Sequence, residues 1–551
     1  MSDQSINREQ SEYDVAVVGG GISGVYTAWK LRRASLDQLK QDLRGLAERR
    51  PDKRLKVGLF ESSRRVGGRL FSLRLPGVPD TPVELGGMRY LSAHTRVVGL
   101  IGHFKMASRK LPTEDPSGRN LYYLRGRHFT AADWFRPAFD PPYRLERGER
   151  TRSPGSLLIE VALRHVRYLQ DDPAAYRNRG FWNLLLDELS DEAYRLVRDA
   201  GGYETIVSNW NAADAIPFLL ADFKPELKYM ALVDGFMALP QAVESEYRET
   251  LGGETHVGHR LYRLDMADNG KRISLVFEKD NPDGFKYPWR IRDGYALEVR
   301  AAHTVLALPR RAIELLHPDS FLFDATVSGQ QFQGDLQAVL PQPGFKIFAA
   351  YKEPWWQSVS GVTADRAFKD KPLVGRSLTD LPLRQCYYWV TGDKAKPNSV
   401  LMASYNDGNS AEFWAGLARQ PERYVPPPEA CPPGIALPSE PADVLAPAAL
   451  VREMQVQLRE LHGVSEVAAD NIPHILMPYI AVCKNWTDDP FGGGWHFWKI
   501  GLDSLRIMRR IRKPFAGIPL YICGEAWSSQ QGWVEGALET ADEVLSQYFW
   551  V

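Results

Sequence analysis

The sequence predicts a mixed α/β and α+β protein in which a Rossmann-like dinucleotide-binding domain is joined to an antiparallel sheet and a helical insertion. Near the N-terminus, an apolar run over residues 15–18 passes into Gly19-x-Gly21-x-x-Gly24 and then into a helical pattern. Apolar residues recur at helical spacing between residues 131 and 229, and short strand-like runs alternate with turns from 344 to 499. A chain of 551 residues can bury two or three such cores.

The three glycines of the first motif lie where a backbone must approach a pyrophosphate. Gly19 permits the tight turn, Gly21 leaves room for a phosphate, and Gly24 lets the helix pack on the strand. The N-terminus of that helix adds oriented N–H groups and a partial positive charge. Strand, turn and helix in this order therefore predict a dinucleotide site.

An acidic residue completes this pattern at the end of a second apolar strand. Glu61 follows the apolar run over residues 55–60, where a carboxylate accepts hydrogen bonds from the ribose hydroxyls of an adenosine. The gap from Gly24 to Glu61 exceeds the usual spacing of about twenty residues. We attribute the excess to a charged helical insertion over residues 35–52.

Composition excludes several classes of partner. The 68 basic and 68 acidic residues balance, which argues against nucleic acid or an anionic membrane as a partner. The first ten residues are polar and the C-terminus has no apolar tail, so we expect neither a secretory leader nor a membrane anchor. The four cysteines are scattered, without a CxxC pair, which predicts no metal site and no disulfide framework and fits a reducing, cytoplasmic location.

Two further motifs carry a resemblance to a known family. Ser62-Ser-Arg-Arg-Val-Gly-Gly-Arg69 follows Glu61 directly, and residues 518–545 read as a strand, a Gly-Glu turn and a helix. Both resemble motifs of the glutathione-reductase-type FAD fold, as used by the flavin amine oxidase superfamily. The resemblance implies that FAD is bound by both ends of the chain. It also implies non-covalent FAD, because no cysteine lies at Gly532-Trp533, where some relatives carry a thioether to the flavin.

The resemblance assigns roles within the cofactor site. Arg69 would neutralise phosphate charge, Glu525 would hold the ribityl chain, and the helix after Trp533 would point its N-terminus at the flavin O2 region. The implied cofactor-binding residues are Gly19, Gly21, Gly24, Glu61, Ser62, Arg69, Gly86, Gly87, Met88, Arg89, Trp486, Glu525, Gly532, Trp533 and Val534.

The same resemblance divides the chain into three domains, two of them discontinuous. We expect an FAD-binding domain over residues 11–90, 240–320 and 500–551, a substrate-binding domain over 91–130 and 321–499, and a helical domain over 131–239. The resemblance extends from about Tyr13 to Leu545 and is weakest over 100–215 and over the Pro-rich stretch 421–447, which we expect to be a surface loop.

The motif Gly86-Gly87-Met88-Arg89 indicates the substrate class. In this superfamily a Gly-Gly turn passes the flavin ring; amine oxidases follow it with small or neutral residues, whereas L-amino acid oxidases place an arginine there. A guanidinium can clamp an α-carboxylate with two hydrogen bonds, and an amine substrate would leave it unpaired. The alternative is that Arg89 holds a structural carboxylate or a flavin phosphate.

Other active-site roles also follow from the resemblance. Lys346 would hold a water at flavin N5, and Tyr405 would join Arg89 at the substrate carboxylate, with Tyr387 and Tyr388 as alternatives. The carbonyl of Gly532 would receive the substrate amine.

Residues for the substrate side chain leave two alternatives open. Phe223, Trp495 and Trp533 would form an apolar pocket for large or aromatic side chains. Asp407 shares a strand face with Tyr405 and would instead favour arginine or lysine if it faces that pocket.

The resemblance implies FAD-dependent oxidative deamination of an L-amino acid by dioxygen, which yields a 2-oxo acid, ammonia and hydrogen peroxide. An amino acid 2-monooxygenase of the same family, which forms an amide with decarboxylation, and a monoamine or polyamine oxidase remain alternatives. Some secreted members carry a histidine base four residues before the pocket phenylalanine; here that position is Leu219, and we expect no protein base. A homodimer is expected from the family.

Overall fold

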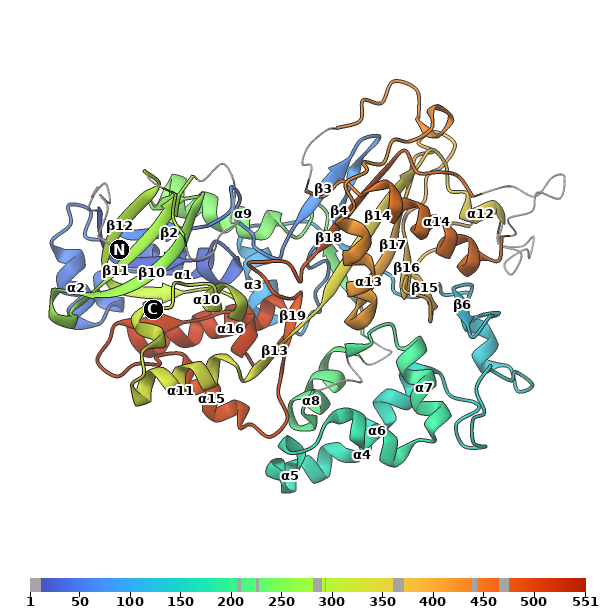
Figure 1. Cartoon of the computed structure of the whole chain (residues 1–551), viewed down its shortest axis with the longest axis horizontal. Coiled ribbons are helices and arrows are strands. Elements are labelled where there is room, and N and C mark those ends of the chain that lie inside the picture. The colour runs from blue at the N-terminus through green and yellow to red at the C-terminus, as the bar shows by residue number, and fades with distance from the viewer. Residues whose placement is uncertain are drawn as a thin grey trace.

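A computed structural model describes residues 11–205, 210–223, 227–280, 290–292, 294–359, 371–438, 443–464 and 475–551. Two large sheets lie on opposite sides of the molecule, and a group of helices lies below the second sheet (Figure 1). The first ten residues, on which the expectation of no secretory leader depends, are outside the described part. Within the described part, no helix has both the length and the apolar character needed to cross a bilayer.

Strands from three separate parts of the chain form the first sheet. The order is β10-β11-β12-β1-β2-β9, and β20 pairs with β12. Its parallel centre joins β1 to β2 and β12, and β10–β12 form an antiparallel extension. The strands are β1 (Ser11–Val18), β2 (Val57–Phe60), β9 (Glu254–His256), β10 (His259–Ala267), β11 (Arg272–Lys279), β12 (Ala296–Leu306) and β20 (Leu520–Ile522). This arrangement confirms the discontinuous Rossmann-like domain.

Helices cover both faces of the first sheet because alternate residues of a strand point to opposite sides. Val15 and Val17 belong to one apolar core, whereas Ala16 and Val18 belong to the other. The first core is covered by α1 (Ile22–Arg33), α2 (Gln41–Glu48), α3 (Thr95–His103), α9 (Ala238–Ser245) and α16 (Val534–Val544). The second is covered by α10 (Arg310–Glu314), α11 (Val327–Leu336) and α15 (Ser504–Ile511).

The glycine turn after β1 has the close contacts that its sequence predicts. Gly19 has a φ of 109°, in the region that favours glycine. A Cβ on Gly24 would lie 1.8 Å from the carbonyl oxygen of Gly19, so only glycine lets α1 pack this near the strand. The N–H of Gly67 donates to the carbonyl of Gly20 at 2.8 Å, which joins this turn to the second glycine motif.

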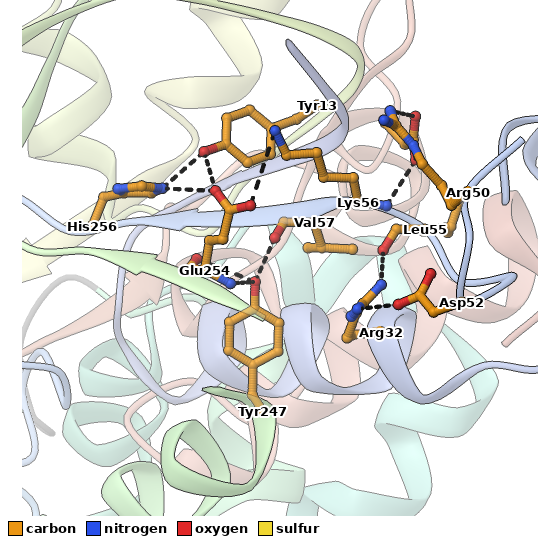
Figure 2. A network of polar contacts seen from close by, with 11 residues as sticks. Tyr13, Arg32, Arg50, Asp52, Leu55, Lys56, Val57, Tyr247, Glu254 and His256 are labelled. Atoms are coloured by element: carbon orange, nitrogen blue, oxygen red, sulfur yellow. Dashed lines mark hydrogen bonds and ion pairs between the residues drawn. The ribbon is translucent and has the colours of Figure 1, made fainter. Parts of the chain in front are cut away.

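A network of polar side chains attaches β9 to the N-terminal part of the first sheet (Figure 2). The hydroxyl of Tyr13 donates to Glu254 at 2.6 Å and lies 2.9 Å from the ring of His256. From the segment after α9, the buried hydroxyl of Tyr247 donates to the carbonyl of Val57 at 2.7 Å. These bonds link residues about 190 to 240 positions apart in the chain.

We predict that Tyr247→Phe destabilises this junction. The substitution leaves buried backbone groups without their partner and should lower the free energy of unfolding by about 1–2 kcal/mol. Thermal denaturation of the purified protein measures the loss. Tyr168→Phe is the control, since Tyr168 is 61% exposed; equal shifts in the two variants would contradict the role of the Tyr247 hydroxyl.

The second sheet is mainly antiparallel, as expected for the substrate domain. Its order is β18-β14-β17-β16-β15-β6-β7, with only the β15–β6 pair parallel. The strands are β6 (Leu121–Leu124), β7 (Arg127–Thr130), β14 (Gly344–Tyr351), β15 (Arg376–Thr379), β16 (Gln385–Val390), β17 (Ser399–Asp407) and β18 (Ile480–Asn485). Three helices lie beside this sheet in Figure 1: α12 (Trp356–Val359), α13 (Gly408–Ala418) and α14 (Ala448–His462).

Three short antiparallel pairs of strands lie outside the large sheets. They are β3 (Ser72–Leu75) with β4 (Val78–Glu84), β5 (Ser108–Lys110) with β8 (Met230–Leu232), and β13 (Val339–Gln342) with β19 (Trp495–Trp498).

The expected helical insertion has a core of its own. It consists of α4 (Pro154–Asp171), α5 (Pro173–Arg177), α6 (Phe181–Glu188), α7 (Asp191–Ala200) and α8 (Ala212–Asp222). Phe497 of β19 belongs to this core, and Tyr405 of β17 and Trp495 of β19 pack against it. The insertion therefore contributes one wall of the space between the sheets.

Candidate active site

A cavity of about 350 Å³ runs between the two large sheets. One end is lined by the glycine turn after β1 and by Glu61, and the other by aromatic residues of α8, β17 and β19. Its volume lies in the range of small-molecule sites. Both ends of the chain contribute to it, because Gly19 and Gly532 line the same space.

The donor groups at the glycine-rich end fit a dinucleotide. The carboxylate of Glu61 is held by the N–H groups of Gly20 at 2.6 Å and Ser63 at 2.8 Å. The N-cap residues of α1 and α16 are Gly21 and Trp533, and neither makes a side-chain capping hydrogen bond. A Cβ on Gly21 would meet nothing within 4 Å, so this turn leaves open space. Uncapped helix N-termini at a cavity are binding sites for anionic groups such as phosphate or reduced flavin.

Arg69 lines the cavity and has an internal ion-pair partner. Its guanidinium pairs with Glu525 at 2.9 Å and donates to the carbonyl of Gly494 at 3.0 Å. That Arg69 also neutralises a phosphate of the cofactor stays a prediction. This pair joins the second glycine motif to the C-terminal motif, a contact across more than 400 residues that local sequence does not reveal.

Glu525 holds two aromatic walls of the cavity in place. Its Oε1 accepts from the backbone N–H of His496 at 2.9 Å and from that of Gly532 at 2.7 Å. Trp495 precedes the first of these residues and Trp533 follows the second, and both tryptophans line the cavity. The ring of His496 adds a further contact to Oε2 at 2.9 Å. One buried carboxylate thus fixes the spacing of both walls.

The pKa of the Glu525 carboxyl is about 2, below its usual value of 4.5. Burial alone raises this pKa, but Arg69, His496 and the N–H of Gly532 favour the charged form and lower it. A depressed carboxyl pKa stabilises the folded state above the unfolded pKa, and this stabilisation is lost as pH falls through the folded pKa.

We predict that Glu525→Gln removes a pH-dependent stabilisation of about 3 kcal/mol at neutral pH. The difference in stability between wild type and variant should shrink between about pH 4.5 and pH 2, measured by tryptophan fluorescence during chemical unfolding at each pH. Glu412→Gln is the control, since Glu412 is exposed. A difference that stays constant over this pH range would contradict the assignment.

Arg89 is buried in a ring of tyrosines. It is 7% exposed and lines the cavity. Its guanidinium donates to the hydroxyls of Tyr203 and Tyr387, each at 3.3 Å. It also stacks 4.0 Å from the ring centroid of Tyr229. Among the described residues, no carboxylate pairs with Arg89, so its charge is available to an anionic ligand, and the alternative of a structural carboxylate partner is not supported.

Sequence reasoning missed two of these tyrosines. Tyr203 lies in the stretch where the family resemblance is weakest, and Tyr229 follows the helical insertion. Tyr405 lines the cavity and packs edge-on against Tyr203, with 5.3 Å between the ring centroids. The tyrosine that contacts Arg89 directly is Tyr387, one of the two residues predicted as alternatives to Tyr405. The sequence shows Arg89 and many tyrosines, but it contains no pattern that indicates which tyrosines contact the arginine.

Lys346 is buried on β14 and points to the Gly86-Gly87 turn. Its Nζ donates to the carbonyls of Gly86 at 2.6 Å and Glu84 at 3.1 Å, and it lies 4.5 Å from the ring centroid of Tyr405. Burial lowers the pKa of Lys346, and burial raises the pKa of the nearby Glu84 carboxyl. The ammonium is thus held beside the cavity by backbone dipoles.

Aromatic residues line the end of the cavity that adjoins the helical insertion: Tyr203, Phe218, Phe223, Tyr405, Trp495 and Phe497. Asp407 is not among them. It is fully buried, and its carboxylate accepts from the N–H groups of Glu204 at 2.8 Å and Thr205 at 3.0 Å. The expectation that Asp407 faces a basic substrate side chain is therefore wrong, because the loop that carries Tyr203 uses this carboxylate.

The cavity brings together most of the residues singled out by the sequence. Gly24 packs the helix on the strand instead of lining the cavity, and Leu219 is fully buried and does not line it. Trp486 lines the cavity and donates to the carbonyl of Leu85 at 2.7 Å. The other predicted residues that line it are Gly19, Gly21, Glu61, Ser62, Arg69, Gly86, Gly87, Met88, Arg89, Phe223, Lys346, Tyr405, Trp495, Glu525, Gly532, Trp533 and Val534.

Fold and site together define a protein of the oxidoreductase class, with a cavity between a Rossmann-like domain and a second sheet whose lining fits a nucleotide cofactor. Residues 22–425 match the family model for flavin containing amine oxidoreductases. The chain belongs to this family, and its cofactor is a flavin.

Individual relatives extend over nearly the whole chain. Aplysianin-A of Aplysia kurodai is 28% identical over 100% of this chain and 92% of the relative. L-amino-acid oxidase 4 of Hebeloma cylindrosporum is 22% identical over 98% of this chain and 82% of the relative. A solved structure of putrescine oxidase superposes with a TM-score of 0.63 at 15% identity, covering 98% of this chain and 100% of that chain, and it shows the same fold.

Proposed function

We propose that this protein is an L-amino acid oxidase that binds FAD non-covalently and deaminates its substrate oxidatively. The observation that carries the proposal is the buried guanidinium of Arg89, which lines the cavity and has no carboxylate partner among the described residues. A buried charge without a partner is costly, and an α-carboxylate supplies the partner. The name of the Hebeloma relative, L-amino-acid oxidase 4, agrees with this substrate class.

The chain's own residues orient the substrate. Arg89 and the hydroxyls of Tyr203 and Tyr405, which line the cavity, bind the carboxylate, and the carbonyl of Gly532 accepts a hydrogen bond from the amine. Phe223 and Trp495 exclude water around the side chain. Fixing these substituents presents the Cα–H of one enantiomer to the cofactor, which is an effect of orientation.

The bound flavin supplies two-electron redox chemistry. Oxidation of the substrate's Cα–N bond leaves an imino acid, which water hydrolyses to a 2-oxo acid and ammonia. Dioxygen takes the two electrons and two protons and leaves as hydrogen peroxide. The uncapped N-terminus of α16 and the ammonium of Lys346 stabilise negative charge that develops beside them.

The experiment that tests the proposal mixes the holoenzyme with each of the twenty L- and D-amino acids. We expect anaerobic bleaching of the flavin by L-enantiomers and, in air, equal amounts of peroxide and 2-oxo acid. Release of CO2 with an amide would identify a monooxygenase instead, and turnover of decarboxylated amines alone would identify an amine oxidase.

The proposal includes a cytoplasmic homodimer. All four cysteines are unpaired, in agreement with a reducing compartment. Sedimentation of the purified protein and fractionation of its cells test these two points.

We predict that Arg89→Ala raises KM for an L-amino acid by about 30- to 1000-fold, because one partner of a buried ionic contact is removed. The flavin spectrum should be unchanged. The corresponding decarboxylated amine is the control substrate, since it has no carboxylate to lose. An unchanged KM for the amino acid would contradict the carboxylate clamp.

We predict that Lys346→Met slows reoxidation of the reduced enzyme by dioxygen about 10- to 100-fold, because a buried positive charge is lost where dioxygen gains electrons. Stopped-flow absorbance measures reoxidation, and anaerobic reduction by substrate should change little.

The same rate should depend on pH in the wild type. Because burial lowers the pKa of Lys346, the ammonium loses its proton as pH rises through a value below 10.5, and reoxidation should slow over that rise. A pH profile that is identical in wild type and Lys346→Met would contradict this role.

A further inference from the structure

A second guanidinium, that of Arg376, donates to the same tyrosine hydroxyl as Arg89. Arg376 is on β15, opposite Tyr387 on β16, and it is half-buried. Its Nη1 donates to the hydroxyl of Tyr387 at 3.2 Å and to Oε1 of Gln385 at 2.7 Å. Among the described residues it has no carboxylate partner. Two arginines therefore converge on one phenolic oxygen without a counter-charge.

These contacts join Arg376 and Arg89 in a closed ring of hydrogen bonds that also includes Tyr387, the Gly202–Tyr203 loop and Gln385. Nη1 of Arg89 reaches the same Tyr387 hydroxyl at 3.3 Å, while its Nη2 reaches Tyr203. Nε2 of Gln385 donates to the carbonyl of Gly202 at 2.8 Å, so the loop that carries Tyr203 is tied back to Arg376. Displacing Arg376 would thus disturb both phenols that hold Arg89.

The oxygen of Tyr387 uses both of its acceptor positions for arginine donors. Its own proton has only a long contact of 3.5 Å to Gln385 Oε1, which already accepts from Arg376. Burial raises the pKa of the Tyr387 phenol, but Arg376 and Arg89 outweigh burial, so the net pKa lies below its usual value. The local field is therefore strongly positive, and repulsion between the two cations persists until an anion arrives.

We propose that Arg376 is a second cation of the carboxylate site and acts through Tyr387 and Arg89. It is a positioning residue, since neither Arg376 nor Tyr387 lines the cavity. It strengthens binding of the anionic end of the substrate without touching it, because charges in a low-dielectric interior act over several ångströms. The inference rests on the proposed function and extends it to a part of the site that does not contact the ligand.

The test compares Arg376→Met and Arg376→Lys in the holoenzyme. For Arg376→Met we expect KM for an L-amino acid and the Kd of the inert carboxylate benzoate to rise about 10- to 100-fold, with kcat changed less than about threefold. Arg376→Lys restores the charge and should recover most of the affinity. Benzoate binding is followed by tryptophan fluorescence, because the ring of Trp533 lies 6.0 Å from the Arg89 guanidinium.

Arg384→Met is the matched control. Arg384 is 6% exposed and directly precedes β16 of the same sheet, and its guanidinium donates to the backbone carbonyls of Thr379 and Arg198. A rise in KM and Kd as large in this control as in Arg376→Met would show general loosening of the sheet and overturn the proposal. Unchanged KM and Kd in Arg376→Met, or a fall in kcat alone, would also overturn it.

Tyr387→Phe keeps the proposal testable if Arg376→Met does not retain flavin. This variant keeps both charges and removes the shared oxygen, so KM and Kd should again rise. Unchanged values would refute the proposal that Arg376 acts through Tyr387. Failure of the proposed function has a different result: Arg89→Ala would then bind benzoate and turn over L-amino acids as the wild type does.

Discussion

The active site depends on one electrostatic constraint, the burial of Arg89 without an internal acid. Desolvating a guanidinium is expensive, and phenol hydroxyls return only part of that energy. The surrounding structure consequently consists of groups that tolerate a cation: Tyr203 and Tyr387 accept from it, and Tyr229 offers its ring. In the proposed function, an anionic ligand supplies the missing counter-charge, and the site selects for a carboxylate.

A second constraint joins the cofactor end of the cavity to the substrate end. Glu525 receives Arg69 from the second glycine motif and the backbone of His496 and Gly532 beside two tryptophans. Residues that approach a flavin and residues that surround a substrate are thus fixed to one carboxylate. The geometry between them is set by short hydrogen bonds within a buried region, where such bonds are strong.

Local patterns in the sequence predicted the fold to a large extent. The glycine turn, Glu61 and the C-terminal Gly-Glu motif placed both chain ends in one domain, and the alternating and helical stretches predicted the second sheet and the insertion. One side-chain expectation did not hold: Asp407 shares a strand face with Tyr405, but its carboxylate accepts from the backbone N–H groups of Glu204 and Thr205 and does not face the cavity. Arg69 pairs with Glu525, a partner that local sequence does not reveal.

By itself the sequence determined the groups whose function is set by their immediate neighbours. Gly24 and Glu61 belong to this class, because a Cβ on Gly24 would meet the carbonyl of Gly19 and the carboxylate of Glu61 accepts from the N–H of Ser63, each within a few residues. Only the tertiary structure decided which phenols surround Arg89 and that Arg376 contacts one of them, Tyr387. Tyr203 and Tyr387 are 114 and 298 positions from Arg89, and packing between layers brings them together without any periodic signal in the chain.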